Sequence, residues 1–196
     1  MGMDHKAYLF DMEKYHMDIE GILDECCHSK STLRAEVYIS EHWKELSSPY
    51  TGEKLDRDWK KGLSDNSFQE YCDILLTACY DCGRDIGLGY SWDGINEILK
   101  QMDFMDNIEK CVLGNQIIFH DITIDPGAMG LGIVGIEDAA IIYEKLLRNK
   151  SRLEDMEVPE DLLYQIEEEE IQDAYDDLVG IYREAVKEKK GILFTF

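Results

Sequence analysis

The chain has 196 residues, of which 44% are hydrophobic and 10% aromatic. This length and composition are typical of folded globular chains and exclude a disordered one, so we expect a single domain over residues 1–196 with its own core. With 42 acidic against 20 basic residues, the formal net charge is −22. Phosphate backbones and anionic lipid headgroups repel such a surface, which argues against nucleic-acid and membrane binding. Two interpretations of the charge stay open: it keeps the chain soluble, which we favour, or it binds a basic protein.

Targeting signals and cysteine usage indicate the compartment. No apolar run reaches the about 18 residues that a membrane-spanning helix needs, and the N-terminus lacks the layout of a secretory signal. We therefore expect a cytoplasmic protein whose six cysteines are reduced thiols and not a disulfide framework.

The first predicted elements are a short strand and two helices. Residues 7–10 read as a strand, and Asp11 is placed to cap the next helix by accepting backbone amide protons. Apolar residues at three- and four-residue steps predict one buried stripe on this helix: Met12, Tyr15, Ile19, Ile22, Leu23 and Cys26. A second helix, beginning at Ser31 or Thr32, is expected to carry its own apolar side chains: Leu33, Val37, Trp43 and Leu46.

A loop and two further helices follow. Residues 47–52 favour turn geometry and form the clearest internal break in the chain. Residues 55–63 predict a short helix, and Ser67 is placed to cap a longer one that ends at Gly83. The apolar stripe of the longer helix contains three cysteines: Phe68, Cys72, Leu75, Leu76, Cys79 and Cys82.

The middle of the chain changes from helix to strand. Residues 93–102 and 108–113 predict two short helices, and Gly114 follows the second, where a left-handed residue is usually needed. Residues 116–124 are rich in β-branched and aromatic side chains and precede an Asp-Pro-Gly turn, which predicts a strand. Residues 130–136 suit either a second strand or a loop.

Helices dominate the C-terminal third. Periodicity predicts a helix over residues 136–148, and Pro159 suits the first position of the next one. The final helix has the clearest stripe in the sequence: Ile171, Ala174, Tyr175, Leu178, Ile181, Tyr182 and Ala185. Its glutamates at 167–170 come early and its lysines late, which suits the helix dipole. Gly191 then ends the helix, and the alternation over residues 192–196 predicts a terminal strand with Ile192, Phe194 and Phe196 on one side of a sheet.

The order of these elements predicts the fold class. Strands at both ends and in the middle, with helices gathered between them, favour a single α+β domain over a regular parallel βαβ design. We expect several helices packed on a small mixed or antiparallel sheet, with the long amphipathic C-terminal helix followed by the terminal strand.

A glycine-rich segment offers a candidate cofactor site. Gly130, Gly132 and Gly135 fit the G-x-G-x-x-G pattern of dinucleotide-binding loops, after a predicted strand and before a predicted helix. In that motif the glycines follow the strand directly and a further strand completes a βαβ unit, whereas here residues 125–130 intervene and no such strand is predicted. We therefore favour a glycine turn or a close-packed strand, and we expect no cofactor.

Cys79 and Cys82 form a C-x-x-C pair, which suggests thiolate metal binding or redox chemistry. Further thiols and imidazoles are available as ligands, but a second C-x-x-C is missing. A thioredoxin-like motif opens its helix, whereas this pair closes one. Because both cysteines lie on the apolar stripe, the sequence favours thiols packed in the core over a metal site.

His120, Asp121 and Asp125 are the candidates for acid–base catalysis, because a histidine with nearby carboxylates can move protons near neutral pH. Adjacent residues on a strand point to opposite faces, which argues against His120 and Asp121 working as a pair. No serine or cysteine lies in a nucleophile elbow either. A partly buried structural histidine is the simpler interpretation.

Three stretches of the sequence match a known family. They are Met-Gly-Met at 1–3, Leu-Asp-Arg-Asp-Trp at 55–59, and Leu-Val-Gly-Ile-Tyr-Arg-Glu-Ala at 178–185 ahead of Gly-Ile-Leu-Phe at 191–194. In these stretches the chain resembles the YfbM-like family of small uncharacterised bacterial proteins. It departs from the family at residues 60–61, where Lys-Lys replaces the usual Leu-His pair. The resemblance implies an α+β fold and supplies no activity or catalytic residue.

Two functions remain open. The first is a non-catalytic interaction protein that binds a basic protein through its acidic surface, as an immunity or inhibitor-type protein does. The alternative is a small-molecule-binding protein or an enzyme with a pocket near residues 116–135. A concave pocket with converging polar groups in that region would favour the alternative. The sequence carries no signal for the oligomeric state.

Overall fold

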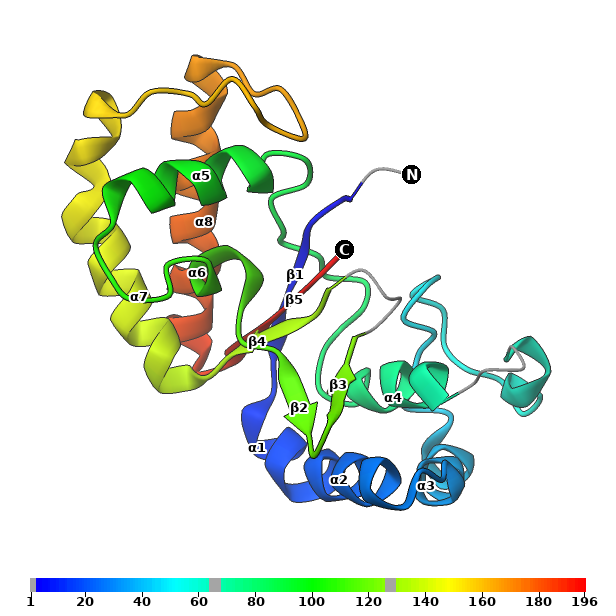
Figure 1. Cartoon of the computed structure of the whole chain (residues 1–196). Coiled ribbons are helices and arrows are strands. Elements are labelled where there is room, and N and C mark those ends of the chain that lie inside the picture. Colours follow the sequence, from blue (N-terminus) through cyan, green and yellow to red (C-terminus); the bar gives the residue numbers. More distant parts are fainter. Residues whose placement is uncertain (1–2, 64–67, 126–129) are drawn as a thin grey trace.

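A three-stranded antiparallel sheet runs through the middle of the molecule in the computed structural model (Figure 1). The structure describes residues 3–63, 68–125 and 130–196. The strands lie in the order β1 (Lys6–Phe10), β5 (Gly191–Thr195) and β4 (Gly132–Val134). The strand that ends the chain is therefore the central one, paired with the first strand on one side and with β4 on the other.

Two groups of elements cover the two faces of this sheet (Figure 1). One face packs against four helices: α5 (Trp92–Met102), α6 (Lys110–Leu113), α7 (Ile136–Asn149) and α8 (Glu168–Glu188). The other face packs against the N-terminal helices and a hairpin: α1 (Met12–Lys14), the π-helical turn η1 (Tyr15–Ile19), α2 (Glu20–Ser29), α3 (Leu33–His42), α4 (Phe68–Leu76), β2 (Ile117–Phe119) and β3 (Ile122–Ile124). We call these groups the α5–α8 side and the α1–α4 side.

Side chains of the central strand alternate between the two cores. Ile192 and Phe194 belong to the core of the α5–α8 side, and Leu193 belongs to that of the α1–α4 side together with Phe10 of β1. All three β5 side chains are at most 1% exposed. The prediction that Ile192, Phe194 and Phe196 face one side of a sheet is confirmed, since Phe196 packs against the same core as the other two. The opposite face, with Leu193, is buried as well, because a central strand is covered from both sides.

The predicted α+β class is confirmed, with an antiparallel sheet and a long C-terminal helix that leads into a terminal strand. Every residue of the predicted stripe on α8 is buried. This helix begins at Glu168 and not near Pro159, and a capping box sets its start: the Glu170 carboxylate accepts the Glu167 amide proton at 3.0 Å. Ahead of it, η4 (Lys150–Asp155) extends α7 by a short 3₁₀ turn.

The chain between η4 and α8 packs on α5 instead of forming the helix predicted at Pro159. The Leu163 amide donates to Asp93 Oδ2 at 2.5 Å, and the Gln101 side chain donates to the Glu157 carbonyl at 2.9 Å. These contacts hold residues 156–167 in an irregular path because side chains of α5 take the hydrogen bonds that a helical turn would use.

The stripe predicted for the first helix is confirmed, since it is buried apart from the partly buried Met12, but the one predicted for the second helix is wrong. On α3, Leu33 and Val37 are 65% and 43% exposed, while Ala35 and Ile39 are buried. The helix is thus rotated so that Ala35 and Ile39 face the neighbouring helices. The positions of the apolar residues in the sequence do not reveal this rotation. The first predicted helix exists in three pieces, because η1 interrupts it between α1 and α2. Asp11 caps α1 as predicted, accepting the Lys14 amide proton at 2.9 Å.

The helix α4 ends at Leu76, well before Gly83. After it the amides of 77–79 bond three residues back, which tightens the turn. The Thr77 hydroxyl accepts the Ser47 amide proton at 3.1 Å, and the Asp11 amide donates to the Cys79 carbonyl at 2.8 Å. Neighbouring segments thus replace the next helical turn. Ser67, the predicted cap of this helix, lies outside the described residues.

Two further segments differ from prediction. Residues 116–124 form not one strand but the hairpin β2–β3, which turns at His120 with a φ of 55°. Residues 55–63 contain only the 3₁₀ turn η2 (Trp59–Gly62). For residues 130–136 the sequence suited either a strand or a loop, and they contain the strand β4. None of the described helices is both long and apolar enough to cross a bilayer.

Candidate functional site

A pocket of about 580 Å³ lies beside residues 116–135, the segment near which the small-molecule alternative expects a pocket. Its described lining comes from five separated parts of the chain: Met3, Trp92, Asn107, Glu109, Lys110, Leu113, Gly114, Asn115, Gln116, Ile118, Gly130, Leu131 and Phe196. This size lies in the range of pockets that hold small organic molecules. We call it the aromatic pocket.

Two aromatic rings form the apolar corner of the aromatic pocket. Trp92, the first residue of α5, and Phe196 meet edge to face with ring centroids 4.9 Å apart. The Trp92 indole is held in place because its Nε1 donates to the Met3 carbonyl at 3.0 Å. Leu131 and the half-exposed Ile118 add aliphatic surface. A flat apolar group would bury its faces against these side chains.

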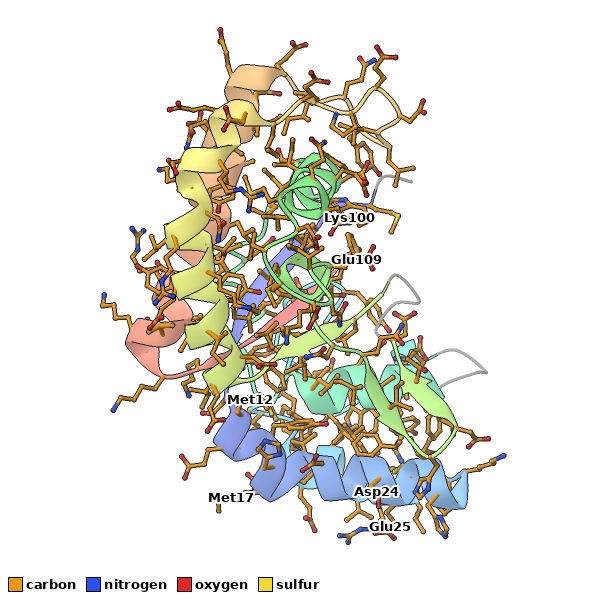
Figure 2. All side chains as sticks on the ribbon, turned by 60° about the vertical axis from the view of Figure 1, so that its left-hand side comes forward. Met12, Met17, Asp24, Glu25, Lys100 and Glu109 are labelled. Carbon is orange, nitrogen blue, oxygen red and sulfur yellow. The ribbon has the colours of Figure 1, made fainter. Side chains whose placement is uncertain are left out.

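The charged side chains at the rim already have partners. Lys110 Nζ lies 3.2 Å from Asp138 Oδ2, and Glu109 Oε1 lies 2.7 Å from Lys100 Nζ. Figure 2 shows Lys100 and Glu109 next to each other on neighbouring segments. The hydrogen bonds that Lys100 donates to the carboxylates of Glu109 and Glu97 raise its pKa above the usual value. The polar groups left to meet a ligand are therefore neutral amides: Asn107, Asn115 and Gln116.

The glycines of the candidate cofactor motif do not share one turn. Gly132 lies inside β4, where a Cβ would come within 1.8 Å of the Leu113 carbonyl oxygen. Gly114, with a φ of 70°, presses against it from the segment after α6. Gly130 precedes the strand and donates its amide proton to Asp125 at 2.6 Å, and Gly135 caps α7. Close packing of two backbone segments thus accounts for the central glycine.

The acid–base candidates point to different partners. His120 Nε2 lies 3.2 Å from Asp24 Oδ1 on α2, and its ring lies 5.0 Å from the ring of His28. Asp125 accepts the Gly130 amide, and Asp121 is exposed at the hairpin turn. The contact to Asp24 joins the hairpin to α2, and sequence spacing could not reveal it because the two residues are far apart in the chain.

Cys79 and Cys82 follow α4 and are not part of a helical stripe. Burial raises the pKa of the Cys79 thiol to about 12 and also raises that of Cys82. Thiols held in the protonated form are poor nucleophiles and poor metal ligands. Within the ranges that the structure describes, no group of three or more His, Cys, Asp or Glu side chains is arranged to hold a metal ion.

Sequence reasoning missed a buried histidine next to the aromatic pocket. His5 is 1% exposed; its Nδ1 accepts the Leu88 amide proton at 3.2 Å, so its Nε2 carries the proton and donates to the Val112 carbonyl at 2.7 Å. Burial lowers its pKa from 6.5 to about 4. The ring packs against Phe194 and Phe196. A neutral histidine thus joins β1, α6 and the aromatic corner, and no local sequence signal marks it.

The acidic residues are unevenly distributed along the chain. Residues 154–177 contain 12 Asp and Glu and no Lys or Arg, so this segment alone carries more than half of the net charge of −22. It comprises the end of η4, the chain that packs on α5 and the first half of α8, at the end of the molecule far from α2 and α3 (Figure 1). Leu163, 67% exposed, lies within it.

Comparisons with known proteins add one likeness. No family model and no curated protein matches the sequence. Among solved structures, the fold is similar to that of YfbM from Escherichia coli, described as a protein of unknown function, with 15% identity, 98% of each chain covered and a TM-score of 0.44. The resemblance to the YfbM-like family is confirmed to this extent, as a likeness over the whole chain at low identity. It supplies no activity.

Proposed function

We propose that this protein binds a small molecule in the aromatic pocket. The observation that carries the proposal is the combination of an aromatic corner, at Trp92 and Phe196, with a rim of neutral amides in a pocket of about 580 Å³. A ligand with a flat apolar ring and uncharged hydrogen-bonding groups fits this lining. Because Lys110 and Glu109 are engaged with Asp138 and Lys100, a highly charged ligand such as a nucleotide would lack free counter-charges.

A ligand screen with a blocked variant tests this proposal. Ile118 is 56% exposed at the mouth of the pocket, so Ile118→Lys obstructs it without opening the core. Neutral aromatic and heteroaromatic compounds are expected to raise the melting temperature of the wild-type chain and to lose that effect in the variant.

The matched control is Ile141→Lys. Ile141 is 51% exposed on α7 and does not line the pocket, so this variant should respond to ligands like the wild type. A screen without any stabilising compound, or one in which both variants respond alike, would contradict the proposal.

The second candidate is a non-catalytic interaction protein that binds a basic protein, of the immunity or inhibitor type. The segregation of 12 acidic residues without a base in residues 154–177 supports it. Opposite charge speeds encounter and fixes orientation, and an exposed apolar side chain such as Leu163 suits the dry centre of an interface. Binding of this kind weakens steeply as salt rises.

Charge-neutralised variants test the second candidate. The triple variant Glu169→Gln, Asp173→Asn, Asp177→Asn removes three exposed charges from the acidic segment. It is expected to recover a basic protein from low-salt lysate at least about tenfold less well than the wild type, the order of effect measured for close charge pairs at interfaces.

A triple variant on the α1–α4 side serves as the control. Asp18→Asn, Glu41→Gln, Glu53→Gln changes the net charge equally at exposed positions outside the segment. If both triple variants lost binding of the basic protein equally, the binding would depend on net charge and not on the acidic segment.

A further inference from the structure

A second cavity, of about 640 Å³, opens along the outer edge of β1. Its walls are the start of α1, the loop after α3, the chain that follows α4 and the residues that end α8. Its lining includes the middle of β1 and eight charged side chains: Asp11, Lys14, Glu45, Lys54, Asp81, Arg84, Glu188 and Lys190. No residue is shared with the lining of the aromatic pocket. We call it the edge cleft.

The backbone of β1 presents one unused hydrogen-bonding pair to the edge cleft. Because β1 is an edge strand, every second residue turns its amide and carbonyl away from β5. At Ala7 both groups are used: the amide donates to Asp85 Oδ1 at 3.1 Å, and the carbonyl accepts from the Ile86 amide at 2.9 Å. The Asp11 amide donates to the Cys79 carbonyl at 2.8 Å. Leu9, which lies between them and turns the same way, has no partner for either group in the described chain.

The charges of the edge cleft are balanced, unlike those of the whole chain. Four basic and four acidic side chains line it, whereas the chain has 20 basic and 42 acidic residues. Several are paired: Lys190 with Asp11 at 2.5 Å and Arg84 with Glu188 at 3.6 Å. Within the described residues Lys14 has no ion pair. A ligand that carries both signs of charge suits this lining.

We propose that the edge cleft binds a free α-amino acid. In an antiparallel ladder a residue meets its partner through its own amide nitrogen and its own carbonyl oxygen. A free amino acid offers the same two atoms, as an ammonium that donates to the Leu9 carbonyl and a carboxylate that accepts from the Leu9 amide. Its two charges then lie among the four basic and four acidic side chains that line the cleft, of which Lys14 is a cation without an ion pair in the described chain. The outward backbone groups of β1 on both sides of Leu9 are already used, at Ala7 and at Asp11, so one residue can pair there and an extended strand cannot.

Titration of the ¹⁵N-labelled chain with each common L-amino acid tests the proposal. At least one of them is expected to shift the Leu9 amide resonance in a saturable way. The same amino acid with an acetylated nitrogen and an amidated carboxyl keeps the hydrogen-bonding atoms and loses both charges, so it should bind at least tenfold more weakly. Lys14→Gln should also weaken binding at least tenfold, whereas Lys44→Gln, at an exposed site outside the cleft, should leave it unchanged.

Asp81→Asn provides a second variant, because its side chain can still accept the Gly83 amide proton that Asp81 accepts at 3.0 Å. It should weaken binding of the amino acid, because the ammonium group of the ligand loses a carboxylate in the cleft. The proposal is overturned if no amino acid shifts Leu9, if acetate or inorganic phosphate produces the same saturable shift, or if Lys14→Gln and Asp81→Asn both bind like the wild type. Loss of the aromatic pocket through Ile118→Lys should not affect this site, which separates the two proposals.

Discussion

The two sides of the sheet are built differently. On the α5–α8 side, α7 and α8 are long, regular and amphipathic, and they pack on the sheet and on each other as continuous helices. On the α1–α4 side the chain is divided into short pieces, with a π-helical turn, a 3₁₀ turn and a two-residue hairpin turn. Four of the five fully buried thiols lie there: Cys26, Cys27, Cys72 and Cys79.

This difference shows how each side obtains its packing. Long helices bury a stripe whose position is set by the sequence, so they need few other contacts to be aligned. Short pieces have few internal hydrogen bonds and depend on their neighbours, as α4 does when Thr77 and Cys79 bond to Ser47 and Asp11. Small thiols suit such close approaches because they fill space without a branched side chain.

The largest effect on stability is expected in β4, the strand that contributes to the cores on both sides of the sheet. Gly132→Ala would place a methyl group 1.8 Å from the Leu113 carbonyl oxygen, and backbone on both sides leaves no room to move. We expect a loss of roughly 5 kcal/mol in the free energy of unfolding, because two backbone segments would have to separate. Urea denaturation followed by circular dichroism measures it.

Gly21→Ala is the control for that substitution. Gly21 lies within α2 and a Cβ there meets nothing within 4 Å, so the change should stabilise the chain by about 0.5–1 kcal/mol. If Gly132→Ala were as mild as Gly21→Ala, the close crossing of β4 by the segment after α6 would be wrong.

A matched pair of core truncations tests whether the two sides unfold together. Ile95 on α5 and Ile39 on α3 are both fully buried, one on each side. Ile95→Ala and Ile39→Ala should each cost roughly 3–4 kcal/mol and keep a single transition, because Leu193 and its neighbours in β5 tie the cores together. Two separate transitions in the Ile39→Ala variant, seen by hydrogen exchange, would show that the α1–α4 side melts by itself.

The pH dependence of stability is expected to act through His5. Its folded-state pKa is about 4 against an ordinary histidine pKa of 6.5, so between these pH values the unfolded chain binds a proton that the folded chain does not. The contribution is complete above about pH 6.5 and is lost as the pH falls to 4, by about 3 kcal/mol in the free energy of unfolding. Urea titrations from pH 7 to pH 4 measure the slope.

His5→Gln sharpens the pH experiment, because the amide can accept from Leu88 and donate to Val112 without titrating. The variant should lose about 3 kcal/mol less than the wild type between pH 7 and pH 4. Equal slopes in the two proteins would mean that His5 is protonated in the folded chain.

The smallest effects are expected at two of the left-handed helix ends. Lys30 after α2 and Lys189 after α8 have φ values of 53° and 54°, one on each side of the sheet. Lys30→Gly and Lys189→Gly should each stabilise the chain by about 0.5–1 kcal/mol, since glycine adopts this conformation without a Cβ conflict. Thermal melts at high salt, which screens the change in charge, measure the gain, and a loss in either variant would contradict the conformation assigned to that cap.

The sequence by itself determined the regular parts of the protein. The stripe from Ile171 to Ala185 predicted the buried face of α8, Asp11 predicted the cap of α1, and Gly114 marked a position of positive φ after α6. These features depend on periodicity and on the conformational preferences of single residues, which act within a few positions of the chain. The α+β class followed from their order.

Tertiary structure decided the remainder. The end of α4, the rotation of α3 and the reversal at His120 each depend on segments far away in the sequence, so local preference could not place them. The same holds for the sites: a pocket was expected near residues 116–135, but Trp92 and Phe196 meet there only because β5 lies at the centre of the sheet. These groups come together through contacts between segments that are far apart in the sequence. Which segments meet is decided by the pairing of the strands in the folded chain and not by spacing along the sequence.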